Sequence, residues 1–370
     1  MPLDGLFPKT EIKPITLESF RREDKPFLIV SYGIGRDSTG LLVLMAQLGI
    51  KPDLILHSNT GSEKDATVAY LPVINNWLRS VGFPEVTVIN ASRTRDKSIE
   101  SHLFRLGIFA GLTYNKHNCS VIWKIENMDR FLKTYAPVIE AKKQGRIICR
   151  AVGFVKGEEY RAVRSDANAI GETTDEHGCK QTTAFAVNPN SEYVTIFPLI
   201  ERNVDFDTVL ELICREDLPI PKKSSCVMCA AMTVKEIYEL SQEEPHNFFR
   251  CLVLERVVQR NQVVKASRIM GIAYGKKWSD FECAMPYEDR IEEVIELFGL
   301  DRAVSDGEAN RRSTGWMKKA ARVELFRECF GNAANLRAFM SGEMDMTDYA
   351  EKVREINHMD TGERQMELPL

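Results

Sequence analysis

A short apolar run that leads into a glycine-rich turn constrains the fold of this chain more than any other feature. Residues 27–30 read Phe-Leu-Ile-Val, Gly33 and Gly35 follow, and residues 39–48 then carry apolar side chains at helical spacing. This order predicts a buried strand, a loop and a helix.

The alternation of strands and helices continues along the chain. Residues 53–57, 86–89, 147–153 and 193–198 are apolar enough for further strands, and a helix is expected at 66–81. Such alternation indicates an α/β fold with a doubly wound, mostly parallel sheet. Residues 165–190 are polar and lack periodicity, which predicts a mobile excursion. A helical region follows from Thr233 onwards, with helices expected at 234–242, 246–260, 287–299, 315–330 and 333–353.

The domain organisation follows from shifts in this pattern. Pro286 and the acidic residues after it open a new helix, so we place a boundary near residue 285. The expected order is an N-terminal arm at 1–24, an α/β domain at 25–285, a helical region at 286–360 and a disordered tail at 361–370.

The net charge and the distribution of apolar residues limit the cellular locations and the binding partners to be expected. The 370 residues carry a net charge of −4, which gives no overall bias towards nucleic acid. No stretch approaches the roughly 20 apolar residues that span a bilayer, and the first residues lack the apolar run of a signal peptide. We therefore expect a cytoplasmic protein with no membrane contact. A basic cluster around Trp316 is either a nucleic-acid face or a solvated helix face; it contains Arg311, Arg312, Lys318, Lys319 and Arg322.

The glycine-rich loop has the residue types that hold an anion. Gly33 and Gly35 let backbone N–H groups approach a phosphate closely, and the helix that starts near Asp37 turns its positive end to the same point. Arg36 adds a positive charge, and hydroxyl donors follow at positions 38 and 39. The loop lacks the ending of a Walker A motif and the third glycine of a dinucleotide fingerprint. A plain strand-to-helix turn remains the alternative.

A second polar segment falls at an equivalent place. Thr60 and Gly61 follow the expected strand at 53–57, as Gly33 follows the strand at 27–30. Ligands of parallel sheets bind outside the carboxyl ends of the strands. The two segments therefore point to one ligand-binding edge.

The motifs resemble a known family. The loop Gly33-Ile34-Gly35-Arg36-Asp37-Ser38 resembles the Ser-Gly-Gly-x-Asp-Ser loop of the PP-loop ATP pyrophosphatase superfamily, in particular its phosphoadenosine phosphosulfate (PAPS) reductase-like branch. Ile34 stands where that motif has glycine, and Asn59 replaces a usual aspartate. Five more segments resemble motifs of the branch in the same order, namely 58–64, 119–124, 153–162, 197–201 and 218–229. The resemblance covers residues 26–281.

The resemblance implies an adenine nucleotide alpha-hydrolase (HUP-like) fold that binds ATP, or PAPS, with Mg²⁺. On this basis the candidate catalytic residues are Asp37, Ser38, Lys124, Glu158 and Arg161. Glu158 and Arg161 also fit a solvated helix start, and His57 also fits a core histidine with one hydrogen bond. The candidate nucleotide contacts are Ser31, Gly33, Gly35, Arg36, Ser38, Thr39, His57, Thr60, Gly61 and Gly153.

Nine cysteines without a secretion signal point to metal, redox or core roles rather than to disulfides. Cys226 and Cys229 form a C-x-x-C pair, and the resemblance places Cys119 near it. Lys116 and Lys124 flank Cys119 and would favour its thiolate.

The resemblance implies a [4Fe–4S] cluster on these cysteines; zinc and no metal remain open. Related proteins have a fourth cysteine near position 209, where this chain has Val209. Cys214 is the nearest substitute, but five residues along a helix turn it to another face. The expected ligands are thus Cys119, Cys226 and Cys229, with or without Cys214.

Three functions follow. The first is an ATP pyrophosphatase that activates a substrate for sulfur transfer to tRNA or DNA. A cysteine desulfurase is the expected sulfur donor, and a homo-oligomer is the expected assembly. The second is a PAPS or adenylyl sulfate reductase, ranked lower because Glu328-Cys329-Phe330-Gly331 lacks the mobile C-terminal motif of those enzymes. The third is a non-catalytic nucleotide sensor of a phage or phage-defence system.

Overall fold

The computed structural model describes residues 15–91, 96–110, 118–165, 170–174, 180–184, 193–261, 272, 277–302 and 314–359. These residues form two compact units, each made of separate stretches of chain. The sheet unit takes Met1–His57, Ala66–Ile89 and Met128–Ser224, and the helical unit takes Ser58–Asp65, Asn90–Asn127 and Ser225–Leu370. The division differs from the boundary expected near residue 285, because residues 225–285 belong with the C-terminal helices.

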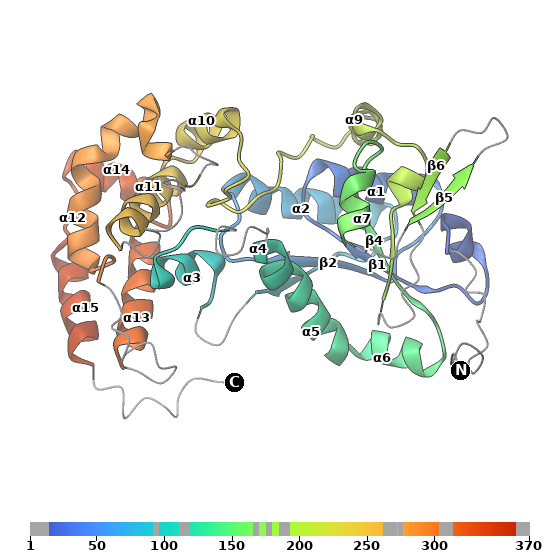
Figure 1. Ribbon diagram of the computed structural model, residues 1–370, viewed down its shortest axis with the longest axis horizontal. Helices are drawn as coiled ribbons and strands as arrows, with labels where there is room; N and C mark the ends of the chain where they lie inside the picture. Colours follow the sequence, from blue (N-terminus) through green and yellow to red (C-terminus); the bar gives the residue numbers. More distant parts are fainter. Residues whose placement is uncertain are drawn as a thin grey trace, which may run out of the picture. The chain divides into compact units, whose positions relative to one another are not determined.

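A five-stranded parallel sheet confirms the expected α/β fold (Figure 1). Its order is β3-β2-β1-β4-β7. In the parallel register, Ile29 of β1 lies opposite Leu54 of β2 and Arg150 of β4. The strands are β1 (Phe27–Ser31), β2 (Leu54–Asn59), β3 (Val86–Asn90), β4 (Ile148–Val152) and β7 (Val194–Ile196).

Helices cover both faces of this sheet (Figure 1). Leu28 and Val30 of β1 pack with α1, α2 and α9, whereas Phe27 and Ile29 pack with α5 and α6. Successive strand residues point to opposite faces, so a strand buried on both sides needs a continuous apolar run. The helices are α1 (Arg36–Gln47), α2 (Asp65–Ser80), α5 (Glu126–Thr134), α6 (Ala136–Lys143) and α9 (Phe206–Arg215).

Smaller elements complete the sheet unit. A 3-10 helix, η1 (Leu17–Arg21), is anchored by its buried Leu17, whose N–H donates to Glu201 Oε1 at 3.1 Å. Within the excursion expected at 165–190, residues 170–174 and 180–184 pair as an antiparallel hairpin, which the sequence pattern did not predict. The hairpin and the remaining helices are β5 (Ile170–Thr174), β6 (Lys180–Ala184), α7 (Glu159–Ser165) and α8 (Pro198–Glu201).

The helical unit has an aromatic core. Phe330 lies 5.1 Å, centroid to centroid, from both Phe249 and Phe339, and Phe104 lies at the same distance from Phe326. Its elements are α3 (Ile99–Leu106), α4 (Asn118–Ser120), the π-helical turn η2 (Val121–Ile125), α10 (Val234–Glu243), α11 (Pro245–Arg260), η3 (Trp278–Asp280), η4 (Glu282–Tyr287), α12 (Glu288–Phe298), α13 (Thr314–Cys329), α14 (Ala333–Ser341) and α15 (Thr347–His358).

One expected helix is divided in two. The helix expected at 333–353 stops at Ser341, because Gly342 adopts φ 77°, the left-handed conformation that closes α14. The expectations for the N-terminal residues 1–14 and for the tail at 361–370 lie outside the described residues. None of the helices in the described ranges is both long and apolar enough to cross a membrane.

Candidate functional site

The glycine-rich loop lies where the winding of the sheet reverses. β1 ends at Ser31 and α1 begins at Arg36, with the loop between them. The chain runs from β1 to β2 and β3 on one side, and then places β4 on the other side of β1. Ligands of doubly wound sheets bind at this reversal, outside the carboxyl ends of the strands. The strand order thus supports the loop as a ligand site.

Ile34 holds the loop in an unusual conformation. Its φ is 56°, and its side chain is buried in the core of the sheet unit. A β-branched residue at positive φ is an outlier that the surrounding structure must impose, and such strain gathers at functional sites. The residue stands where the family motif has glycine, the one residue that adopts this conformation without strain.

The loop wraps around the hydroxyl of Ser38. The backbone N–H groups of Gly33 and Gly35 each donate to Ser38 Oγ at 3.3 Å, and Ser38 Oγ donates to the carbonyl of Gly35 at 3.1 Å. Converging backbone N–H groups at the start of a helix are the arrangement that binds phosphate. The predicted contacts Gly33, Gly35 and Ser38 are therefore brought together at one point.

Two other segments of the sheet unit lie in close contact with the loop. A Cβ on Gly153, after β4, would lie 2.9 Å from the carbonyl oxygen of Asp37. A Cβ on Gly35 would lie 2.6 Å from Ser224 Oγ. A side chain at residue 153 would meet backbone, so glycine is required there, whereas one at residue 35 would require the Ser224 hydroxyl to move away. Ser224 was not predicted as a site residue. Its position two residues before Cys226 is the signal that could have identified it.

Charged groups gather beside the loop. Asp37 Oδ1 is buried and has no hydrogen-bond partner in the described part of the chain. Burial raises the pKa of Asp37, as does the charge of Glu158, while Arg36 and Arg161 work in the opposite direction. Arg161 donates to Glu158 Oε1 at 2.5 Å. These carboxylate oxygens are the ligand type that Mg²⁺ prefers.

The two guanidinium groups are held by aromatic rings. Arg36 lies over Phe206 at 4.6 Å from the centroid, and Arg161 lies over Phe154 at 4.3 Å. Stacking of this kind orients a guanidinium while its N–H groups stay available to phosphate oxygens.

Three predicted contacts lie on the core side of the loop. Thr39 is fully buried, and its hydroxyl hydrogen-bonds to that of Tyr32 at 3.0 Å. His57 is also buried, and its Nδ1 lies 2.9 Å from the carbonyl oxygen of Tyr32. Ser31 Oγ faces Met128 Sδ at 4.0 Å. Thr39 and His57 therefore support the loop from inside, whereas Ser31 is half-buried and faces α5.

Thr60 and Gly61 belong to the helical unit, where they form part of a thiol cluster. Thr60 Oγ1 lies 3.2 Å from Cys226 Sγ and donates to Glu63 Oε1 at 2.9 Å. Backbone pairing joins Glu63 to Cys226, and the N–H of Val227 donates to the carbonyl of Ser62 at 2.7 Å. The segment Thr60–Glu63, named the strap below, thus holds the C-x-x-C pair.

Lys124 is the cation of this cluster. It lies on the π-helical turn η2, a rare element that is frequent at functional sites. Burial lowers the pKa of Lys124, but the charges of Glu63, Cys226, Cys229 and Cys119 together raise it above its usual value. Lys124 therefore stays an ammonium.

Two thiols of the cluster, those of Cys226 and Cys119, have pKa values above the usual value for cysteine. Burial, and then Glu63, raise the pKa of Cys226 to about 12, although Lys124 and Thr60 lower it. The pKa of Cys119 is also raised, by burial first and then by Cys229, and Lys124 only partly offsets this. Lys124 favours the Cys119 thiolate, as expected, but burial outweighs its charge, so the pKa of Cys119 is raised overall. Lys116 lies outside the described residues.

The arrangement of these cysteines does not form a ready metal site. Within the described ranges, no set of three or more His, Cys, Asp or Glu side chains is placed to hold a metal ion. Cys119, Cys226 and Cys229 have suitable donor atoms, and all three lie around Lys124 in the helical unit. Cys214 is exposed on α9 of the sheet unit, whereas Val209 is fully buried against Gly40 of α1.

The basic cluster near Trp316 is largely internal. Lys319 and Arg322 are buried, and Arg105 lies over the Trp316 ring at 3.9 Å. Burial and the neighbouring Arg322 lower the pKa of Lys319 to about 8, against the effect of Asp301. The described part of the cluster is therefore not a solvated helix face; Arg311 and Arg312 lie outside the described residues.

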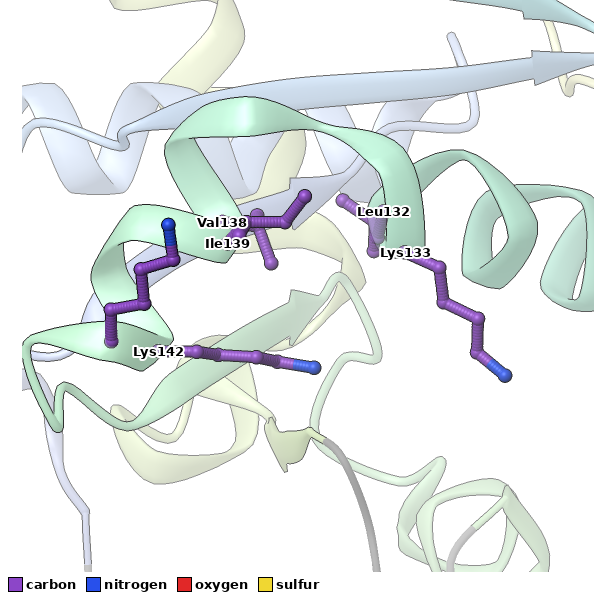
Figure 2. Close-up of a pocket in the computed structure, with 6 residues that line it drawn as sticks. Leu132, Lys133, Val138, Ile139 and Lys142 are labelled. Atoms are coloured by element: carbon purple, nitrogen blue, oxygen red, sulfur yellow. The ribbon is translucent and has the colours of Figure 1, made fainter.

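A surface hollow of the sheet unit lies between α5 and α6 (Figure 2). None of the predicted site residues lines it. Its lining is apolar side chains and lysines, namely Leu132, Lys133, Val138, Ile139, Lys142 and Lys143.

Comparison with known proteins adds no assignment. No protein-family model matches the chain, and a search of curated proteins finds no match. The function is therefore inferred from the motifs and from the geometry of the two sites.

Proposed function

We propose that this chain is an adenine-nucleotide-binding enzyme of the PP-loop type that converts ATP to AMP and pyrophosphate and so activates a substrate for sulfur transfer. The observation that carries the proposal is the loop at the carboxyl end of β1. Its N–H groups at Gly33 and Gly35 converge on Ser38 Oγ, and Ile34 is held at φ 56° between them. This conformation favours glycine, as in the motif that the loop resembles.

Each charged group near the loop has a role in this reaction. The loop N–H groups and Ser38 hold the terminal phosphates, and Arg36 and Arg161 offset the charge that develops on pyrophosphate as it leaves. Asp37 and Glu158 would hold the Mg²⁺ that accompanies ATP, and the ion would offset the charge of the phosphates. An oxygen of the substrate attacks the α-phosphorus, the bond to pyrophosphate breaks, and a sulfur nucleophile then displaces AMP.

The acceptor and the sulfur source come from the resemblance, which implies tRNA or DNA as the acceptor and a cysteine desulfurase as the donor. The cytoplasmic location and the homo-oligomer stay predictions. The thiol cluster with Lys124 supports sulfur chemistry because it gathers three thiols in one place.

An iron–sulfur cluster or a zinc ion at these thiols stays a prediction. Iron, acid-labile sulfide and zinc should be measured on protein purified without oxygen. About four irons and four sulfides per chain, lost in Cys226→Ala and kept in Cys149→Ala, would establish a cluster. One zinc ion would instead make the pair structural.

The reductase alternative gains no support from the structure. Cys329, the cysteine nearest the C-terminus, is fully buried at the end of α13, and burial raises its pKa to about 12. A mobile nucleophile needs an accessible thiol of ordinary or lowered pKa.

Release of AMP and pyrophosphate from ATP, with Mg²⁺ present, tests the proposal. Asp37→Asn and Ser38→Ala should abolish turnover, and Asp207→Asn, at an exposed position on α9, is the matched control. Tight ATP binding without turnover in the unaltered chain would favour the nucleotide-sensing alternative. Equal turnover in Asp37→Asn and the control would show that the loop is not the active site.

A further inference from the structure

The C-terminal helices reach the thiol cluster through one arginine. Arg327 lies on α13, in the part of the chain that shows no resemblance to the family, and its Nη2 donates to the carbonyl of Gly61 at 2.6 Å. Gly61 is the turn residue of the strap, at φ 73°. A Cβ on it would lie 2.6 Å from Cβ of Ser98, so the strap has no room to move towards α3.

The same arginine holds the strap at a second point. Arg327 Nε donates to Oε2 of Glu100 at 3.2 Å, and this oxygen also accepts from the hydroxyl of Ser62 at 3.3 Å. Glu100 is fully buried, and Arg250 is its other ion-pair partner, at 3.1 Å. Removal of the Arg327 guanidinium would leave the carbonyl of Gly61 without this donor. It would also leave the buried carboxylate of Glu100 with one cation fewer, which destabilises the folded state.

From these contacts we propose that Arg327 is a positioning residue for Cys226, acting through the strap Thr60–Glu63. The strap holds Cys226 by three contacts: the Thr60 hydroxyl to the thiol, the backbone pairing of Glu63 with Cys226, and the Val227 N–H to the carbonyl of Ser62. The role of the C-terminal helices is thereby to keep the thiol shielded and to set its reactivity. The inference builds on the thiol cluster of the proposed function, but its test requires no ATP turnover.

Reactivity of Cys226 in the full chain provides the test. Iodoacetamide is added in short pulses across a pH series, and the alkylation of each cysteine is quantified by mass spectrometry. In Arg327→Gln the strap loses the donor to Gly61 and opens more often, so the reagent reaches the thiol more often. Alkylation of Cys226 at pH 8 should therefore be about tenfold faster or more. Arg327→Lys, which keeps the charge, should restore part of the shielding.

Control variants distinguish the positioning of Cys226 by Arg327 from a general loss of stability in the helical unit. Arg256→Gln removes another ion pair of the helical unit, with Glu288 and Glu292, and should leave Cys226 unchanged. Cys329, in the aromatic core, should stay unreactive in every variant. If Arg327→Gln does not fold, Ser62→Ala weakens the same link and should show the same effect in smaller measure. A folded variant with the wild-type alkylation rate at Cys226, or one in which the rate at Cys329 rises by the same factor, would overturn the proposal.

Discussion

Gly153 lies so close to the first turn of α1 that a Cβ on it would be 2.9 Å from the carbonyl oxygen of Asp37. The end of β4 and the start of the nucleotide loop therefore touch through their backbones. Gly153→Ala should force these segments apart by several tenths of an ångström and weaken ATP binding about tenfold, because loop N–H groups lose their alignment. Calorimetric titration with ATP measures the change.

Gly82→Ala provides the control for this substitution. Gly82 has φ 72° and open space around its Cβ position. Its replacement should cost stability through the backbone but leave ATP affinity unchanged. An equal loss of affinity in both variants would mean that Gly153 acts only through general stability.

The positive φ of Ile34 predicts that glycine at this position gives a more stable variant than alanine, the reverse of the usual order. Both Ile34→Ala and Ile34→Gly remove a buried side chain and should destabilise the chain. Alanine keeps the strained φ of 56°, whereas glycine relieves it, so the glycine variant should be more stable by about 1 kcal/mol. Denaturant unfolding of the two variants decides the question. A more stable alanine variant would show that residue 34 has an ordinary backbone conformation in solution.

The raised pKa of Asp37 predicts an unusual dependence of stability on pH. A carboxyl whose folded pKa lies above its unfolded value destabilises the folded state above that pKa, and the penalty fades as the pH falls through it. Asp37→Asn should thus be at least as stable as the wild type at pH 7, and its advantage should shrink at acid pH. Thermal unfolding from pH 4 to 8 measures this difference. A loss of stability at neutral pH in Asp37→Asn would contradict this prediction. The loss of ATP turnover expected for the same variant follows separately from the proposed role of Asp37.

Glu63 and Lys124 should shift the reactivity of Cys226 in opposite directions. Glu63 raises the pKa of this thiol and Lys124 lowers it. Glu63→Gln should therefore speed alkylation of Cys226 at pH 8, and Lys124→Met should slow it. The measurement is the same pulse alkylation across pH, with buried Cys149 as an internal reference. Shifts of the same sign in both variants would rule out direct electrostatic control.

Local pattern was enough to predict most of the sheet unit. The apolar run at 27–30 is buried on both faces, and helical spacing at 39–48 corresponds to α1. Gly33, Gly35 and Ser38 were predicted as one anion site because their spacing along the chain already limits how far apart they lie. The hairpin of β5 and β6 was missed, since its polar residues show no apolar alternation.

The sequence by itself determined the α/β class and the loop that ends β1, because both depend on neighbours in the chain. Tertiary structure decided the rest. The strand order that places the loop beside β4, the close approach of Gly153 to Asp37 and the reach of Arg327 to Gly61 join residues far apart in sequence. The pKa of Cys119 shows the same limit: flanking lysines are visible in the sequence, but the burial that outweighs Lys124 exists only once the chain has folded.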